Sequence, residues 1–120
     1  MPTVTDPPLG LDKADTIPAL LAAAARAFPD SDAVVDGKIG VTYASLAERA
    51  EQVAGALIAA GIGKGDRVAV WAPNSAAWIE AMLGIHSAGA VLVPLNTRYQ
   101  GKEAAYILKR SRAQVLFTVS

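Results

Sequence analysis

The clearest hydrophobic pattern lies between residues 44 and 60, where apolar side chains recur with the period of an amphipathic helix. Gly61 is well placed to end this helix, because glycine readily adopts the left-handed conformation of a C-terminal cap. A second helix is predicted to begin after Thr16, whose hydroxyl can cap it, and to end at Pro29. The apolar stripe of the first helix comprises Leu46, Ala50, Val53, Ala54, Leu57 and Ile58, and that of the second comprises Ile17, Leu20, Leu21, Ala24 and Phe28.

Two short runs of β-branched residues between positions 33 and 43 flank Asp36 and Gly37, a pair typical of tight turns. We predict a β-hairpin over this stretch. From residue 67 onward, short apolar runs alternate regularly with helical patterns. These predict strands over residues 67–72, 91–95 and 114–119, and helices over residues 76–88 and 101–111.

The order β-α-β-α-β, with strands that are apolar on both faces, predicts an α/β fold whose parallel strands are covered by helices on both sides. Right-handed crossovers would complete a doubly wound layout. The chain stops in or just after the third strand, and so apolar an edge strand is an aggregation hazard unless another strand pairs with it. We therefore expect an incomplete sheet that belongs to a larger one. Residues 1–14, which contain three prolines, are expected to be a flexible lead-in.

Composition narrows the class of protein. The 120 residues suit one domain, and 52% hydrophobic with 18% charged residues argue against disorder. Eleven basic residues balance eleven acidic ones, so no nucleic-acid surface is expected. The absence of cysteine excludes disulfides and thiolate catalysis and is compatible with a cytoplasmic protein. We find neither a signal peptide nor an apolar run long enough to span a membrane.

The glycine-rich stretch GIGKGD, residues 61–66, does not fit a nucleotide-binding motif. A dinucleotide fingerprint follows a strand and opens a helix, whereas this stretch follows a helix and precedes a strand. Its glycines are also spaced Gly-x-Gly-x-Gly, so we interpret it as a helix cap and turn. His86 is the single histidine, and no carboxylate or nucleophile partner is evident from spacing. A packed or helix-terminal histidine is the favoured interpretation.

Asn96, Thr97 and Arg98 are the candidates for a binding site, because they follow the carboxyl end of a predicted parallel strand. Ligands of open α/β sheets bind at that edge. The guanidinium of Arg98 suits a phosphate group in particular. The alternative is that Arg98 only pairs with Glu103 or with water in an ordinary strand-to-helix loop.

Four stretches in order resemble the N-terminal segment of the adenylate-forming acyl-CoA synthetases, and together they cover nearly the whole chain from about residue 16. Thr42, Tyr43 and Leu46 match the first core motif of the family, and the residues that match its second are Ala88, Gly89, Ala90, Pro94, Leu95 and Asn96. The sequence PLNTRY most resembles that of fatty-acid and carboxylic-acid CoA ligases. Among these, it favours the branch that activates steroid-ring fragments. The stretches are FPDSDAVV, VTYASLAERAEQVAGAL, GDRVAVWAPNSAAWIEAMLGIHSAGAVLVPLNTRY and EAAYILKRSRAQVLFT.

The resemblance implies an AMP-forming ligase of lipid and fatty-acid metabolism. In that reaction a carboxylate attacks the α-phosphate of ATP with Mg²⁺ present, and the thiol of coenzyme A then displaces AMP from the acyl-adenylate. The resemblance places the catalytic and metal-binding residues beyond Ser120. This chain is accordingly expected to be a non-catalytic portion, residues 15–120, of the large adenylation domain. By itself, this portion is expected to bind none of ATP, Mg²⁺ and CoA. A homodimer of the whole protein is a further possibility.

One functional position carries over from the resemblance. In a related aroyl-CoA ligase, the arginine two places after the strand-end asparagine contacts the nucleotide phosphates of coenzyme A, and Arg98 occupies that place. Family members often have proline where Thr97 stands, so the local loop can differ. Thr42, Tyr43, Pro94 and Asn96 are interpreted as scaffold. Two other functions remain as alternatives, a stand-alone α/β module that binds a nucleotide or a partner, and a dehydrogenase-type half-domain, against which the misplaced glycines argue.

Overall fold

The computed structural model describes residues 14–118, so the lead-in predicted for residues 1–14 lies almost wholly outside the described residues. Each predicted helix and strand is confirmed, with bounds that differ by one or two residues. In chain order the elements are α1 (Ile17–Ala27), β1 (Asp32–Asp36), β2 (Ile39–Thr42), α2 (Tyr43–Ala59), β3 (Arg67–Trp71), α3 (Ala76–Ser87), β4 (Val91–Pro94), α4 (Gly101–Ser111) and β5 (Val115–Thr118).

Three of the helices begin with the same device, a hydroxyl that accepts a hydrogen bond from a backbone N–H of the first turn. Thr16 Oγ1 accepts from Ala19 N at 3.2 Å in α1. Thr42 and Ser75 cap α2 and α3 in the same way, at 3.2 and 3.1 Å. Each hydroxyl satisfies one of the N–H groups that a helix start leaves without a partner.

Helices α2, α3 and α4 also end alike. In each, one residue in the left-handed conformation closes the last turn, and the next residue donates its N–H to the carbonyl oxygen five residues back, as in a Schellman motif. The closing residues of α2 and α3 are Gly61 (φ 91°) and Gly89 (φ 79°), and the closing residue of α4 is Arg112 (φ 57°). The N–H groups that complete the motifs donate from Ile62 to Leu57 O, from Ala90 to Ile85 O and from Ala113 to Leu108 O, at 3.0, 3.1 and 3.2 Å.

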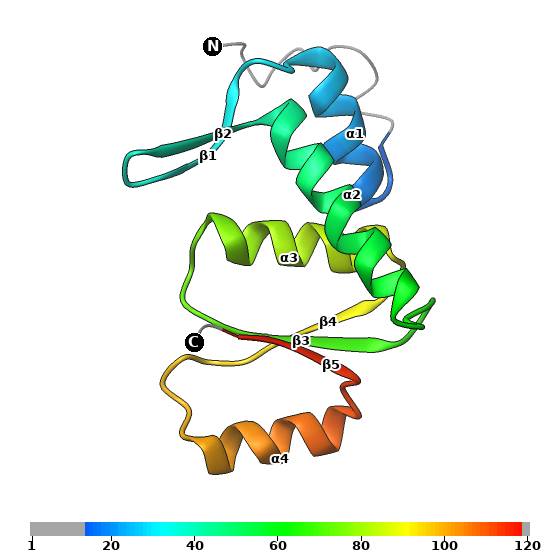
Figure 1. Ribbon diagram of the computed structural model, residues 1–120, viewed down its shortest axis with the longest axis vertical. Coiled ribbons are helices and arrows are strands. Elements are labelled where there is room, and N and C mark those ends of the chain that lie inside the picture. The colour runs from blue at the N-terminus through cyan, green and yellow to red at the C-terminus, as the bar shows by residue number, and fades with distance from the viewer. Residues whose placement is uncertain (1–13, 119–120) are drawn as a thin grey trace.

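The main sheet has the strand order β4-β3-β5, and both pairings are parallel. Helices α2 and α3 cover one face and α4 covers the other (Figure 1). Side chains of the central strand alternate between these layers. Val68 and Val70 pack in the cluster that contains Ile85 of α3, and Ala69 packs against Ala104 of α4. All three strand residues are buried, which explains why the strand is apolar on both faces.

The predicted hairpin forms a separate sheet of two antiparallel strands, in which Asp36 lies opposite Ile39. Gly37 has φ 62°, a conformation that glycine supplies at low cost. The Oδ2 atom of Asp36 accepts a hydrogen bond from the N–H of Ala76 at 3.1 Å. The hairpin therefore also contributes a partner to the N-terminus of α3.

Parts of the predicted apolar stripes do not reach a core. Ile58 is 58% exposed, although Leu46, Ala50, Ala54 and Leu57 of the same helix are buried. The stripe of α1 lines an open apolar groove of ≈ 430 Å³ between α1, the hairpin and α3, which leaves Ile17 45% exposed. Among residues 14–118, no helix is both long and apolar enough to cross a membrane.

Candidate functional site

The carboxyl edge of the main sheet is the place where the predicted polar residues gather. The chain leaves β3 toward α3 on one face and leaves the neighbouring strand β4 toward α4 on the other face (Figure 1). Adjacent strands whose connections depart to opposite faces define a topological switch point, and ligands of open α/β sheets bind in the crevice there. The segments that border this crevice are residues 72–75 after β3 and residues 95–98 after β4.

A set of hydrogen bonds fixes the loop after β4 against β3. The N–H of Leu95 donates to Val70 O at 2.9 Å and continues the strand pairing by one residue. The indole Nε1 of Trp71 donates to the carbonyl oxygen of Asn96 at 3.1 Å. Asn96 also holds the turn that follows, because its Oδ1 accepts from the N–H of Arg98 at 2.9 Å. The abrupt change from an apolar strand to Asn-Thr-Arg is thus a turn with a defined shape.

Two adjoining hollows lie at this edge. The larger, ≈ 440 Å³, is bordered by the residues after β3 and after β4, including Asn74, Asn96 and Thr97. The smaller, ≈ 380 Å³, lies beside it, includes Trp71 and Thr118, and shares Thr97 with the first. Amide and hydroxyl groups interspersed with apolar side chains suit an uncharged, hydrogen-bonding part of a ligand.

Arg98 follows Thr97, which borders both hollows, but it is exposed and is not itself a lining residue of either. The alternative pairing with Glu103 is not formed. The carboxylate of Glu103 instead accepts from the N–H of Gln100 at 2.8 Å, and the ion pair found within residues 14–118 joins Arg49 to Glu80. Arg98 is therefore exposed and forms no ion pair within the described residues.

The other candidates behave as structural residues. His86 lies half-buried in the last turn of α3, and its carbonyl oxygen accepts from Gly89 N at 3.0 Å. The stretch GIGKGD is a turn between α2 and β3, with positive φ at Gly61 and Gly65. Asp66 Oδ2 accepts from Gly63 N at 2.8 Å within that turn. Both interpretations drawn from the sequence agree with this placement.

Sequence reasoning missed three residues of the crevice, Trp71, Asn74 and Trp78. Trp71 lies in the predicted strand over residues 67–72 and Trp78 in the predicted helix over residues 76–88. Each packs against a core cluster, yet each is only half-buried and borders a hollow. Asn74 lies in the short segment that joins this strand to this helix. Their position in the sequence could have identified Trp71 and Asn74 as candidates, since Trp71 ends the first strand of the parallel sheet and Asn74 follows it.

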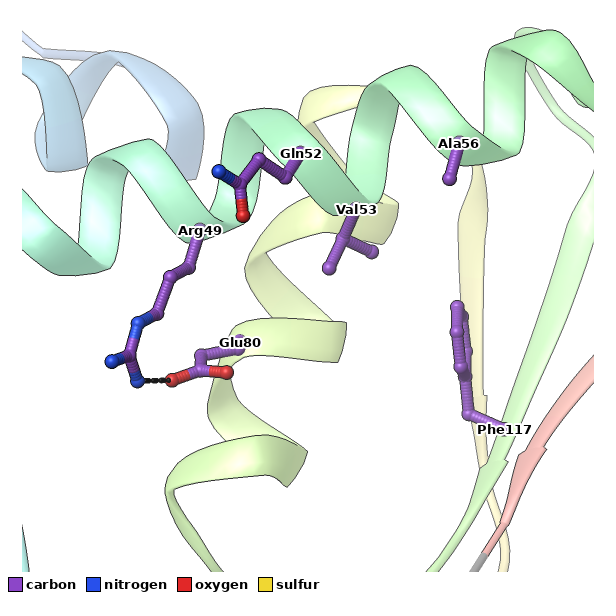
Figure 2. Close-up of a pocket in the computed structure, with 6 residues that line it drawn as sticks. All are labelled: Arg49, Gln52, Val53, Ala56, Glu80 and Phe117. Atoms are coloured by element: carbon purple, nitrogen blue, oxygen red, sulfur yellow. Dashed lines mark hydrogen bonds and ion pairs between the residues drawn. The ribbon is translucent and has the colours of Figure 1, made fainter.

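A third hollow, of ≈ 420 Å³, is lined by residues of α2, by Glu80 of α3 and by Phe117 of the outer strand β5. Figure 2 shows Arg49 of α2 and Glu80 of α3 pointing toward one another, with Phe117 beyond them on the sheet. The Arg49 guanidinium and the Glu80 carboxylate are 2.7 Å apart. Because each charge here is already partnered, this hollow offers a packing surface and no unpaired charge.

Comparison with known proteins gives a consistent result. The sequence model of the AMP-binding enzyme family matches residues 21–120. The chain is 46% identical over 101 residues to the 3-[(3aS,4S,7aS)-7a-methyl-1,5-dioxo-octahydro-1H-inden-4-yl]propanoyl:CoA ligase of Rhodococcus jostii (strain RHA1), an alignment that covers 84% of this chain and 20% of that relative. It is 38% identical over 103 residues to the mitochondrial medium-chain acyl-CoA ligase ACSF2 of Macaca fascicularis, which covers 84% of this chain and 17% of that relative.

The fold has close counterparts among solved structures. The Mycobacterium tuberculosis fatty acyl CoA synthetase matches with a TM-score of 0.83 at 37% identity, over 89% of this chain and 22% of that one. The α/β layout with a parallel three-stranded sheet and a hairpin is therefore shared with an adenylate-forming enzyme. The chain spans about a fifth of the length of the curated relatives it matches.

Proposed function

The chain belongs to the AMP-binding enzyme family, and from this membership we propose that the whole protein is an AMP-forming acyl-CoA synthetase. Residues 15–120 would be the N-terminal part of its large domain. The observation that carries the proposal is the 46% identity to a CoA ligase across 84% of this chain. The chain would contribute sheet, helices and one edge of the ligand crevice, while the groups that perform the chemistry would lie elsewhere in the protein.

The proposed reaction has two steps. A carboxylate oxygen forms a bond to the α-phosphorus of ATP, and the bond from that phosphorus to the bridging oxygen of pyrophosphate breaks. The sulfur of coenzyme A then forms a thioester with the acyl carbon while the thiol proton passes to solvent, and AMP leaves with the electron pair of the broken C–O bond. The first step is needed because a free carboxylate is a poor acyl donor until its oxygen becomes a phosphate leaving group.

Within this reaction, Arg98 would contact the nucleotide phosphates of coenzyme A. Arg98 is exposed and follows Thr97, and its backbone N–H donates to Oδ1 of Asn96 at 2.9 Å, which supports this role. A planar guanidinium forms charge-assisted, paired hydrogen bonds with phosphate oxygens. Thr97 borders both hollows, so the chain of coenzyme A could pass from Arg98 along this loop.

Magnesium would accompany ATP in the whole enzyme. Over residues 14–118, no group of three or more histidine, cysteine, aspartate or glutamate side chains is placed to hold a metal ion. A cytoplasmic location and a homodimer of the whole protein remain predictions, to be tested by subcellular fractionation and by sedimentation of the purified protein.

Exchange of pyrophosphate into ATP tests the activity of the complete protein. We expect exchange that depends on a carboxylic acid, measured over a panel of medium-chain fatty acids, aromatic acids and propanoic acids on fused rings. The last class is included because of the acyl group named in the Rhodococcus relative. Absence of exchange with every acid, for protein shown to be folded, would contradict the proposal and favour a binding module.

A further inference from the structure

The C-terminal end of α4 carries a concentration of positive charge that the proposed reaction does not use. A hollow of ≈ 630 Å³ is lined by Tyr106, Lys109, Arg110 and Arg112, which we call the basic face. All four residues are exposed. Arg98 lies three residues before the first residue of α4, and Arg112 directly follows the last. The two arginines are therefore separated by the 11-residue helix, which is about 16 Å long.

The charge of the basic face is local and has no counterion within the described residues. The whole chain has eleven basic and eleven acidic residues, yet residues 101–118 contain four basic side chains and one acid, Glu103. That carboxylate lies in the first turn of α4 and accepts from the N–H of Gln100. The ion pair in residues 14–118 is between Arg49 and Glu80, on other helices.

The backbone of Arg112 gives a second, independent observation. Arg112 is the single residue other than glycine with positive φ among residues 14–118, and it occupies the closing position that Gly61 and Gly89 occupy in α2 and α3. A side chain at this position costs free energy that glycine avoids. Favourable interaction with the helix dipole accounts for Lys109 and Arg110 in the last turn, but glycine would close the helix better than Arg112.

Three unpaired cations also limit what can cover this face in the whole protein. Burying an unpaired charge against an apolar surface is strongly unfavourable, so the partner must be anionic. No hydrogen bond within the described residues fixes the charged groups of Lys109, Arg110 or Arg112, unlike the guanidinium of nearby Arg67, which donates to Ser111 O at 2.9 Å. Cations that no hydrogen bond fixes suit a fluid anionic surface better than a small ligand, which needs fixed contacts.

We propose that the basic face docks the protein onto a membrane surface that contains acidic phospholipids. Clustered lysine and arginine side chains bind anionic headgroups. Tyr106, which is 62% exposed, adds an aromatic ring with a polar tip, the type of side chain that is enriched at the membrane–water interface. Docking is peripheral and reversible, and it does not depend on the proposed ligase activity.

Sedimentation with vesicles tests the proposal on the complete protein. Vesicles of phosphatidylcholine with about 30% phosphatidylserine should bind it, pure phosphatidylcholine vesicles should not, and raising salt from about 0.1 to 0.5 M should release it. The double variant Lys109→Gln/Arg110→Gln should bind roughly 30-fold more weakly. The matched control Arg26→Gln/Lys38→Gln removes the same charge from α1 and the hairpin, and it should bind like the wild type.

Arg112→Gly separates docking from folding, because it should raise the melting temperature while weakening vesicle binding roughly fivefold. Equal binding of the Lys109/Arg110 variant and the wild type would overturn the proposal. So would equal binding to neutral vesicles, or displacement by about 1 mM ATP, which would indicate a small-anion site. Binding to polyglutamate without binding to acidic vesicles would overturn it in favour of an acidic protein partner.

Discussion

Arg98 and Arg112 lie before and after α4, and their backbone conformations differ. The N–H of Arg98 is held by Asn96 Oδ1 in a turn that any residue can adopt, so replacing its side chain leaves the loop intact. Arg112 has a positive φ that disfavours every side chain. A variant at Arg98 therefore reports on ligand contact, whereas a variant at Arg112 changes contact and backbone strain together.

For Arg98→Ala in the complete protein, we expect the KM for coenzyme A to rise about tenfold, because a charge-assisted hydrogen bond to phosphate contributes about 1.5 kcal/mol. Pyrophosphate exchange should be unchanged, since coenzyme A is not needed for the first step. Steady-state kinetics with varied coenzyme A measure the effect, and Arg26→Ala on α1 is the matched control. An unchanged KM for coenzyme A would count against the contact while leaving the ligase proposal in place.

Sequence could place Asn96, Thr97 and Arg98 at the end of a strand, since the change from apolar to polar residues marks that end. It could not show that Trp71 donates to the carbonyl oxygen of Asn96. That bond joins residues 25 positions apart in the chain and exists only because β3 and β4 are neighbours. Contacts between strand ends depend on strand order, which hydrophobic periodicity does not contain.

At the scale of the elements, Gly84 lies at a close contact between α2 and α3. A β-carbon built at this position would lie 2.3 Å from Cγ1 of Val53 on α2 and 3.2 Å from Ala50 O. Gly84 is buried in the middle of α3, where glycine is otherwise unfavourable. The absence of a side chain is thus what allows the two helices to pack at this distance.

Gly84→Ala should lower the free energy of unfolding by about 2 kcal/mol, because the added methyl group overpacks the contact between the helices. Chemical denaturation of the complete protein measures the change. Gly55→Ala is the matched control, since a β-carbon there meets nothing within 4 Å. This control should stabilise α2 by about 0.5–1 kcal/mol.

A second variant tests the cause. Val53→Ala removes the side chain that the new methyl group would strike, so the double variant Gly84→Ala/Val53→Ala should be more stable than the sum of the single effects predicts. Strictly additive losses would show that Val53 is not the obstacle.

Periodicity predicted the elements well and their partners less well. The stripe of α2 contains Leu57 and Ile58, yet Leu57 is buried and Ile58 is exposed, because only part of the stripe lies over the sheet and α3. The stripe of α1 faces a groove that stays open in this part of the protein. An apolar pattern indicates which face of a helix seeks burial, but the position of its neighbours decides how much of that face is covered.

At the scale of the whole molecule, β4 and β5 are the outer strands, and within the described residues each pairs only with β3. Val91 is 47% exposed and Leu116 is 37% exposed on these strands. Outer strands with apolar side chains and unpaired backbone groups invite pairing with another chain. In the complete protein we expect further residues to cover them.

Produced alone, residues 1–120 should therefore self-associate at micromolar concentration, as measured by sedimentation velocity over a dilution series. Leu116→Lys should weaken this association about tenfold, because charged side chains protect natural edge strands. Ala105→Lys, at an exposed position of α4, is the control for the added charge. A monomer at every concentration would show that the two edges are already protected.

The strand order β4-β3-β5 also determines which strand edge is exposed while the chain is being synthesised. During synthesis the N-terminal part of the chain leaves the ribosome first, so β3 and β4 can pair before β5 has been made. At that stage one edge of β3 has no neighbouring strand. The missing strand, β5, ends at Thr118, 24 residues after β4 ends at Pro94. At about 5–20 residues per second, synthesis of that interval takes roughly 1–5 s. During those seconds the buried centre of the finished sheet is an exposed edge, and a chaperone that shields nascent chains would protect it there.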